Sequence, residues 1–226
     1  MLRSKIKMRL FLKGGSDLQK GETKIINKIV KTVKNPSLLI LQWTSKNRKK
    51  NLKYRKILTK YFKSIGVKKV LFTDFKESRE KIIQKIVKSN LIYLPGGDPI
   101  LLYKTIKKKK LVGKLKNFKG TIFGGSAGAL IQCEKYIIIK SQDNYKRTKL
   151  EQGIGLIDII VSVHYGSERK ESAGENAEEE LKNISKKLKI KIYAIAEKSA
   201  IEYYNRKIKF HGKIFYFNNG KKKRVN

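Results

Sequence analysis

Residues Gly124-Gly125-Ser126-Ala127-Gly128-Ala129 lie between two apolar runs, Thr121-Ile122-Phe123 and Leu130-Ile131. This order predicts a strand that turns sharply into a helix, with Ser126 on the turn and small residues on both sides. Such a turn holds the serine hydroxyl above the end of a sheet and leaves free N–H groups at the start of the helix. A nucleophilic serine needs both features. A glycine-rich turn that packs a helix closely on a strand, or that cradles a phosphate, has the same pattern.

The composition is that of a globular protein. The chain has 226 residues, 40% of them hydrophobic, which is long enough to bury a sizeable core. No apolar stretch approaches the roughly 20 residues of a membrane span, and the run from Met8 to Leu12 is too short for a secretory signal. We therefore expect a cytoplasmic protein with no membrane partner. A single cysteine and two histidines argue against a structural zinc site, and no metal or cofactor is expected.

The net charge is strongly positive, because 55 Lys and Arg residues against 18 Asp and Glu residues give +37. Such a charge attracts polyanions nonspecifically, in a way that depends steeply on salt. The cations are spread along nearly the whole chain, lysine dominates over arginine, and no known nucleic-acid-binding motif accompanies them. We interpret the charge mainly as a solvated surface, with nucleic acid as the alternative partner.

Short apolar runs alternate with longer amphipathic segments over the first two-thirds of the chain. This alternation predicts the α/β class, a mostly parallel sheet flanked by helices. Short alternating runs between Ala200 and Phe217 predict antiparallel strands at the C-terminal end. We predict one domain over residues 1–217 and a frayed basic tail over 218–226. The predicted strands of the α/β part are Met8–Leu12, Leu38–Leu41, Val67–Phe72, Leu91–Leu94, Tyr136–Ile139, Ile157–Val163 and Lys191–Ala196.

A second glycine turn, Gly96-Gly97, follows the predicted strand Leu91–Leu94. Asp98 is suited to cap the next helix, and Pro99 stands at the first helical position, where its missing N–H costs nothing. Ligands collect at the carboxyl ends of parallel strands. Because both glycine turns fall at such ends, we expect them to lie close together.

A serine at neutral pH needs a base, and histidine is the usual one. His211 is best interpreted as a surface turn residue between terminal strands, whereas His164 stands where a buried strand emerges beside a polar loop. A carboxylate must then hold the imidazole in the correct tautomer. Glu197 follows another strand end and leads the candidates, with Asp143 as its rival, and Glu134 is also within reach of the serine helix.

Four segments of this chain resemble peptidase family S51, and they occur in the family's order: Gly96-Gly97-Asp98, Gly125-Ser126-Ala127-Gly128-Ala129, His164, and Ala196-Glu197-Lys198-Ser199-Ala200. The family contains peptidase E, an alpha-aspartyl dipeptidase, and cyanophycinase. Its fold is flavodoxin-like and similar to that of class I glutamine amidotransferases. The resemblance extends from about Leu10 to Tyr203. It implies Ser126 as nucleophile, His164 as general base and Glu197 as the orienting acid. If the orienting acid instead lies between the serine and the histidine in the sequence, the resemblance implies Asp143.

The resemblance also implies an oxyanion hole formed by the N–H groups of Gly97 and Ala127. For substrate binding it implies Asp98, which stands where the family has Asn or Gln, and Arg169, a cation retained after the histidine. The family's Gly-Glu-Thr-Arg segment is similar to Gly174-Glu175-Asn176-Ala177. Ala177 thus replaces the arginine that binds an aspartyl carboxylate in peptidase E-like members.

The sequence therefore predicts a serine-type peptidase that hydrolyses short peptides, in the manner of a dipeptidase, through an acyl-enzyme. The alternative is a noncatalytic member of the same fold that binds a small molecule or a nucleic acid at the Ser126 pocket. Serine at the turn, where glutamine amidotransferases have cysteine, argues against ammonia transfer. Cys133 is interpreted as a small buried side chain farther along the serine helix.

Overall fold

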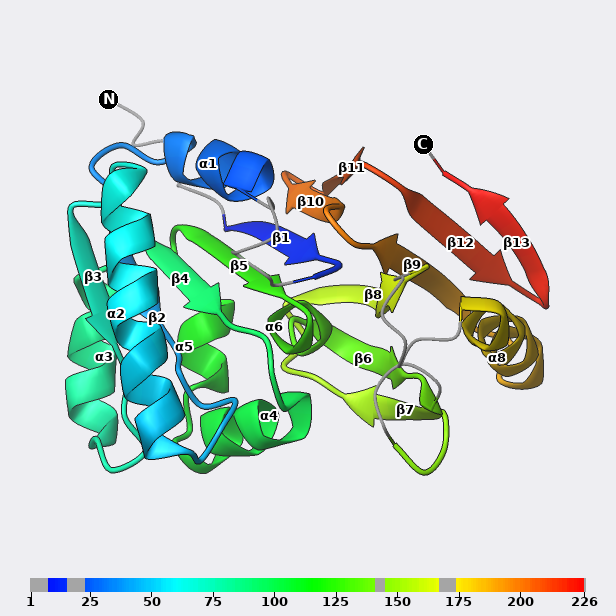
Figure 1. Ribbon diagram of the computed structural model, residues 1–226, viewed down its shortest axis with the longest axis horizontal. Helices are drawn as coiled ribbons and strands as arrows, with labels where there is room; N and C mark the ends of the chain where they lie inside the picture. Colours follow the sequence, from blue (N-terminus) through cyan, green and yellow to red (C-terminus); the bar gives the residue numbers. More distant parts are fainter. Residues whose placement is uncertain (1–7, 16–22, 141–144, 167–173, 226) are drawn as a thin grey trace.

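The computed structural model describes residues 8–15, 23–140, 145–166 and 174–225, and it contains two sheets side by side (Figure 1). The first sheet has seven strands in the order β11-β10-β1-β5-β4-β2-β3. Five neighbouring strands of this sheet, β1-β5-β4-β2-β3, are parallel to one another. The remaining two, β10 and β11, are added to β1 by antiparallel pairing. The strands of this sheet are β1 (Arg9–Lys13), β2 (Ser37–Ile40), β3 (Lys69–Phe72), β4 (Leu91–Leu94), β5 (Thr121–Gly125), β10 (Ala200–Tyr204) and β11 (Lys207–His211).

The second sheet has six strands in the order β13-β12-β9-β8-β6-β7. Its centre, β9-β8-β6, is parallel, and antiparallel strands complete both edges. The strands are β6 (Cys133–Ile138), β7 (Lys149–Gln152), β8 (Ile157–Tyr165), β9 (Lys191–Ala196), β12 (Ile214–Asn218) and β13 (Lys221–Arg224).

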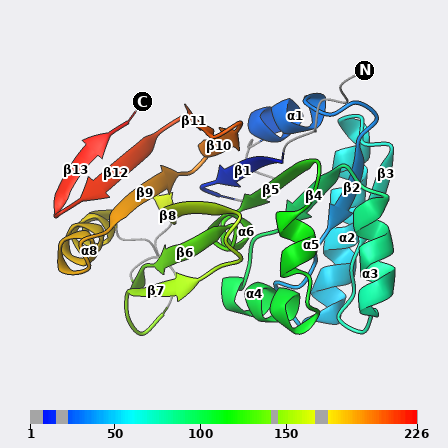
Figure 2. The ribbon, with the colours of Figure 1, turned by 180° about the vertical axis from the view of Figure 1, so that it is seen from behind.

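Helices cover both faces of the first sheet. Successive side chains of a strand point to opposite faces, so Phe11 packs with α1 and α2, while Leu10 and Leu12 pack in the core that contains α3, α4 and α5. Figure 2 shows this second face from behind. The helices are α1 (Thr23–Lys31), α2 (Arg48–Ser64), α3 (Arg79–Val87), α4 (Pro99–Lys108), α5 (Val112–Lys116), α6 (Ala127–Leu130) and α8 (Gly174–Lys187).

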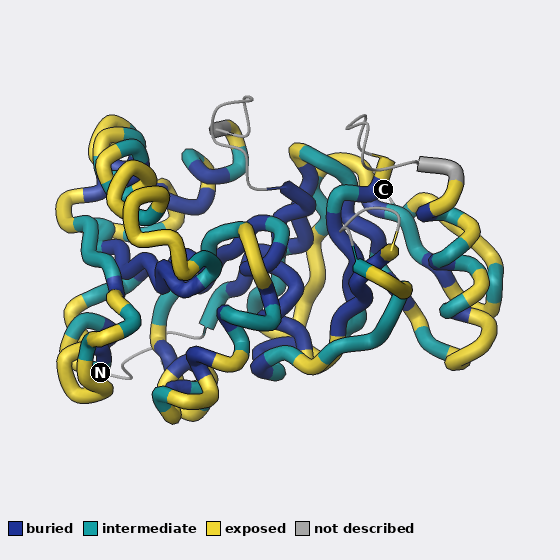
Figure 3. The backbone as a smooth tube through the Cα atoms, turned by 60° about the horizontal axis from the view of Figure 1, so that its bottom comes forward, coloured by how far each residue is buried: buried dark blue, intermediate teal, exposed yellow. Residues whose placement is uncertain are grey.

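The two sheets share one hydrophobic core. The cluster that contains Leu10 and Ile122 of the first sheet also contains Val161 and Ile195 of the second. The other face of the second sheet packs against α8. Figure 3 shows the buried residues gathered in the interior of the molecule and the exposed ones along its periphery. Among the described residues, no helix is long and apolar enough to cross a membrane.

The α/β class and the C-terminal antiparallel strands are as predicted, and Asp98 caps α4 by accepting a hydrogen bond from the N–H of Leu101. Three details differ from the predictions. The strands form two sheets rather than one. The serine helix ends at Leu130, so Cys133 begins a strand. The basic tail is not frayed, because Lys221–Arg224 pair with β12.

Candidate active site

Ser126 occupies the sharp turn between β5 and α6. Its backbone has φ 52° and ψ −121°, a conformation that is costly for any residue with a Cβ. Three hydrogen bonds fix the turn: the Ser126 N–H donates to the carbonyl of Lys13 at 3.2 Å, and the Ser126 carbonyl accepts from the N–H groups of Ala129 at 2.8 Å and Leu130 at 3.1 Å. The turn therefore holds the serine side chain at the carboxyl edge of the first sheet.

The glycines beside Ser126 allow α6 to pack almost in contact with the sheet. A Cβ on Gly124 would lie 2.3 Å from the carbonyl group of Gly128, and a Cβ on Gly128 would lie 1.8 Å from the carbonyl oxygen of Leu94. Side chains cannot fit at either position. The small residues of this stretch thus have a packing role as well as a role in exposing the serine.

His164 belongs to the second sheet, near the end of β8. Its φ is +59°, and the pairing of β8 with β9 is irregular between Ser162 and Tyr165. This irregularity turns the imidazole toward the first sheet, where Nε2 lies 2.8 Å from the Ser126 hydroxyl oxygen. The His164 side chain is 14% exposed, so it lies at the surface of the core and not within it.

Glu197 follows β9 in the second sheet, in the turn that leads to β10. Its Oε1 lies 2.6 Å from Nδ1 of His164. The turn is held from the far side by Ser199, whose hydroxyl donates to the Glu197 carbonyl at 3.2 Å and accepts from the N–H of Lys213 at 2.9 Å. With a carboxylate at Nδ1, the neutral imidazole carries its proton there and presents Nε2 to the serine as an acceptor.

The Gly97 turn lies beside the serine turn. Strands β4 and β5 are adjacent and parallel, with Leu94 paired to Gly124, so both loops leave the same edge. Gly97 has φ +126° and lies against Thr44, with which a Cβ would collide at 2.8 Å. Among the described residues, neither the N–H of Gly97 nor that of Ala127 has a hydrogen-bond acceptor. Two donors are thus available at this edge of the sheet.

Gly14 joins the two halves of the site, and sequence reasoning missed this role. Its carbonyl accepts the N–H of His164 at 3.1 Å, and its own N–H donates to the Ser199 carbonyl at 3.0 Å. A Cβ on Gly14 would lie 2.1 Å from the carbonyl oxygen of Ala196, the residue before Glu197. The only sequence signal is the pair Gly14-Gly15 directly after the first strand.

The model of peptidase family S51 matches residues 10–211 of this sequence. The chain belongs to peptidase family S51. It is therefore a serine peptidase by family, which agrees with a serine and a histidine in hydrogen-bond contact at the edge of its sheet. A comparison with curated proteins finds no match.

Solved structures of peptidases have the same fold as this S51 chain. A peptidase from an acI-B1 Actinobacterium is 17% identical, with a TM-score of 0.70 over 96% of this chain and 93% of that one. A peptidase E-like protein from Listeria monocytogenes EGD-e is 19% identical, with a TM-score of 0.65 over 97% of this chain and 99% of that one. At these identities the likeness concerns the fold alone.

The predicted substrate-binding residues of this S51 peptidase differ in how they are placed. The Asp98 side chain is engaged as the cap of α4. Ala177 is fully buried in the core between α8 and the second sheet. Arg169 lies outside the described residues, as does Asp143, the rival acid.

The other residues considered for the site lie in surroundings that indicate a structural role or none in catalysis. His211 hydrogen-bonds to Glu202 at 2.8 Å and stacks on Phe11, and Glu134 is exposed on β6. Cys133 is fully buried, and this burial raises the pKa of its thiol far above the usual range. Its thiol is therefore an inert part of the core. No cluster of metal-ligating side chains occurs within the described ranges.

Replacing Gly14 by alanine should impair the site more than it impairs the fold. The new methyl group would push the end of β9, and with it Glu197, away from His164. We expect kcat to fall about 100-fold, since small misplacements of reacting groups have effects of this size. KM should change little, and stability should fall by about 1–3 kcal/mol. Steady-state kinetics measures kcat and KM, and thermal unfolding measures the change in stability.

Gly113→Ala is the matched control, because a Cβ at Gly113 of α5 meets nothing within 4 Å. It should leave both constants unchanged and raise stability slightly through helix propensity. If Gly14→Ala and Gly113→Ala have the same kcat, Gly14 does not position the site.

Proposed function

We infer that this chain hydrolyses peptide bonds through an acyl-enzyme, with Ser126 as nucleophile, His164 as general base and Glu197 as the acid that orients the base. One observation carries the proposal: the same imidazole lies 2.8 Å from the Ser126 hydroxyl and 2.6 Å from the Glu197 carboxylate. Serine, base and orienting acid in this arrangement are the requirements of nucleophilic catalysis by serine.

The first half of the proposed reaction forms the acyl-enzyme. Ser126 Oγ attacks the carbonyl carbon of the substrate while its proton passes to Nε2 of His164. The resulting imidazolium is stabilised by Glu197 at Nδ1. The protonated Nε2 then donates its proton to the leaving amine, the C–N bond breaks, and the acyl group stays on Ser126. In the second half, water loses a proton to Nε2 and attacks the acyl carbon, and Ser126 recovers its proton as the acid product leaves.

The N–H groups of Gly97 and Ala127 are proposed to bind the oxyanion of both tetrahedral intermediates. Their positions follow from features of the backbone that do not need a ligand: the positive φ of Gly97 and the start of α6 at Ala127. Donors that are oriented before the reaction stabilise developing charge without reorganisation, and one such donor contributes roughly 3–4 kcal/mol to lowering the barrier.

We propose short peptides as substrates, as the S51 family and the likeness to a peptidase E-like protein suggest. Asp98 and Arg169 are the proposed substrate-binding side chains. Because Ala177 is buried and lacks a charge, it cannot bind a carboxylate. We therefore expect weaker selectivity for aspartyl peptides than an arginine would give, although the charge of +37 still attracts acidic peptides.

A fluorophosphonate probe and a dipeptide library test this proposal together. We expect the probe to label the native protein once and mass spectrometry to place the adduct on Ser126. Heat-denatured protein should remain unlabelled, because activation depends on the folded site. Hydrolysis of library members should disappear in the labelled sample. An adduct on another serine would assign the nucleophile elsewhere. A folded protein that neither reacts with the probe nor hydrolyses any library member would favour the noncatalytic binding protein instead.

A further inference from the structure

Helix α2 carries an unusual concentration of positive charge. No Asp or Glu occurs between Glu22 and Asp74, a span that includes the whole helix. All of its basic residues except Arg55 are exposed. They are Arg48, Lys49, Lys50, Lys53, Arg55, Lys56, Lys60 and Lys63.

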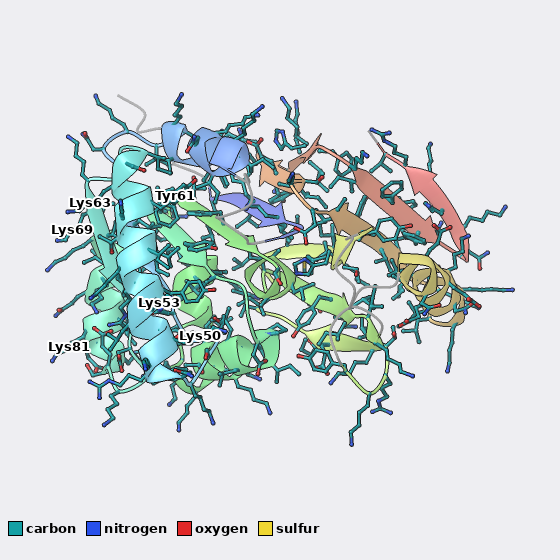
Figure 4. The ribbon with its side chains drawn as sticks, in the orientation of Figure 1. Lys50, Lys53, Tyr61, Lys63, Lys69 and Lys81 are labelled. Carbon is teal, nitrogen blue, oxygen red and sulfur yellow. The ribbon has the colours of Figure 1, made fainter. Side chains whose placement is uncertain are left out.

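Five of these residues form a single row, which we call the lysine stripe: Lys49, Lys53, Lys56, Lys60 and Lys63. Their spacing alternates between four and three residues, which places them on one face of a helix. The face is opposite to the one that buries Leu58 and Phe62 against the sheet. At 1.5 Å per residue the stripe is about 21 Å long. Figure 4 shows Lys53 and Lys63 along α2, with Lys69 and Lys81 on the same side of the molecule.

The lysine stripe is not neutralised within the described part of the chain. Arg55 is the one cation of α2 with a carboxylate partner there, Asp74 at 3.4 Å. Helix α8 is the contrast: its Glu178 pairs with Lys182 at 2.7 Å and with Lys222 of β13. Like charges three and four residues apart destabilise a helix. The stripe therefore does not serve the stability of α2, whereas a bound polyanion would relieve its repulsion.

We propose that the lysine stripe binds the phosphodiester backbone of nucleic acid. A helix that carries a straight row of lysines is complementary to a chain of regularly spaced phosphates, and each contact between an ammonium group and a phosphate releases a condensed counterion. Tyr54 is 48% exposed but lies on a side of α2 that is turned away from the stripe, so the proposed contacts are to phosphates and do not include stacking on a base. A lipid surface fits less well, because the apolar face of α2 is already buried against the sheet.

This binding is independent of the proposed peptidase activity. Helix α2 begins after the carboxyl end of β2, at the edge where Ser126 lies, and runs back to the start of β3 at the opposite edge. The stripe thus leads away from Ser126. Its residues can be changed without touching any group assigned to catalysis.

The test compares two triple variants that lose the same charge. One is Lys53→Gln, Lys56→Gln, Lys60→Gln in the stripe. The other is Lys207→Gln, Lys209→Gln, Lys223→Gln, at exposed positions of β11 and β13. Fluorescence anisotropy measures the binding of a labelled oligonucleotide of about 20 residues, as RNA and as DNA, between roughly 50 and 200 mM salt. Circular dichroism verifies that both variants are folded.

We expect the unchanged protein to bind both oligonucleotides with Kd of about 10⁻⁵–10⁻⁶ M near physiological salt. The stripe variant should lose at least about 10-fold in affinity for both, and the slope of log K against log salt should become shallower by about 2–3. The control variant should lose less than about 3-fold, because it removes no stripe lysine.

Equal losses of affinity in the two variants would mean that the overall positive charge of the protein, and not the stripe, attracts the oligonucleotide. This result would overturn the proposal. Absence of binding by the unchanged protein near 0.15 M salt would overturn it as well. Vesicles with phosphatidylserine provide the last comparison. Binding to these vesicles without binding to either oligonucleotide would assign the stripe to a membrane surface instead.

Discussion

Replacing Ser126 by alanine should lower kcat for peptide hydrolysis by about 10⁵–10⁶-fold and abolish fluorophosphonate labelling, while the protein remains folded. The loss is large because no other group can form the acyl-enzyme, and the base and the oxyanion donors cannot compensate for a missing nucleophile. What remains should be a rate about 10³-fold above water, from the oxyanion donors and substrate binding. Steady-state hydrolysis of the best library dipeptide, together with gel-based labelling, measures both effects.

The fold should tolerate this change for reasons visible at the turn. The Ser126 side chain makes no capping hydrogen bond to α6, so the hydroxyl contributes little to the helix. Alanine also keeps the Cβ, so the backbone strain at φ 52° stays the same. Ser126→Gly removes the Cβ, and we expect it to be about 1 kcal/mol more stable than Ser126→Ala and equally inactive. Exposed Ser64→Ala is the control and should retain full activity. Appreciable hydrolysis by Ser126→Ala would assign the nucleophile elsewhere.

The parallel part of the fold is predictable because its strands are buried on both faces. Leu91–Leu94 is buried at each residue, and such a strand appears in the sequence as a continuous apolar run between turn signals. The turns that end these strands are also predictable, because paired glycines and a helix-capping Asp98 are typical of turns and rarely occur within strands. The strand ends therefore locate the edge at which the candidate site residues gather.

The division into two sheets depends on pairings that local patterns do not specify. β10 pairs with β1, whereas β12, only a few residues later, pairs with β9 of the other sheet. Both are short, largely apolar runs, AIEYY and IFYFN, and neither run specifies its partner. β13 contains no apolar residue, so its basic sequence resembles that of a tail. It forms a strand through its backbone pairing with β12. Such long-range partners are a tertiary property.

Two features of the site are equally nonlocal. Helix α6 ends after one turn because the carbonyls of Ile131 and Gln132 accept hydrogen bonds from Ile154 and Leu156 of a distant segment. This ends the helix before Cys133, although the apolar run continues. The positive φ of His164 and its hydrogen bond to Gly14 likewise arise where the two sheets meet. Sequence position predicts that His164 is near a strand end. It does not predict that the His164 side chain reaches from the second sheet to Ser126 on the first.

Glu197→Gln should lower kcat by about 10⁴-fold with little change in KM, and Asp143→Asn should leave kcat within about 3-fold of the unchanged enzyme. Glutamine has the same shape as glutamate, so the turn after β9 should keep its form. It has no negative charge, however, and cannot stabilise the imidazolium that forms when Ser126 attacks. If its amide nitrogen faces Nδ1 at the 2.6 Å contact, it also favours the tautomer with the proton on Nε2, which cannot accept the serine proton.

The two carboxyl variants separate the candidate acids because each removes one charge at nearly constant size. A large loss in Asp143→Asn with a small loss in Glu197→Gln would transfer the orienting role to Asp143. Glu197→Asp refines the assignment: it keeps the charge but shortens the side chain by one methylene, so it should recover part of the lost kcat. A role of Glu197 in folding alone predicts the reverse order, since the shorter side chain leaves a gap that glutamine does not. The rank of these variants in kcat, measured at equal folded fraction, thus distinguishes charge at Nδ1 from mere packing of the turn.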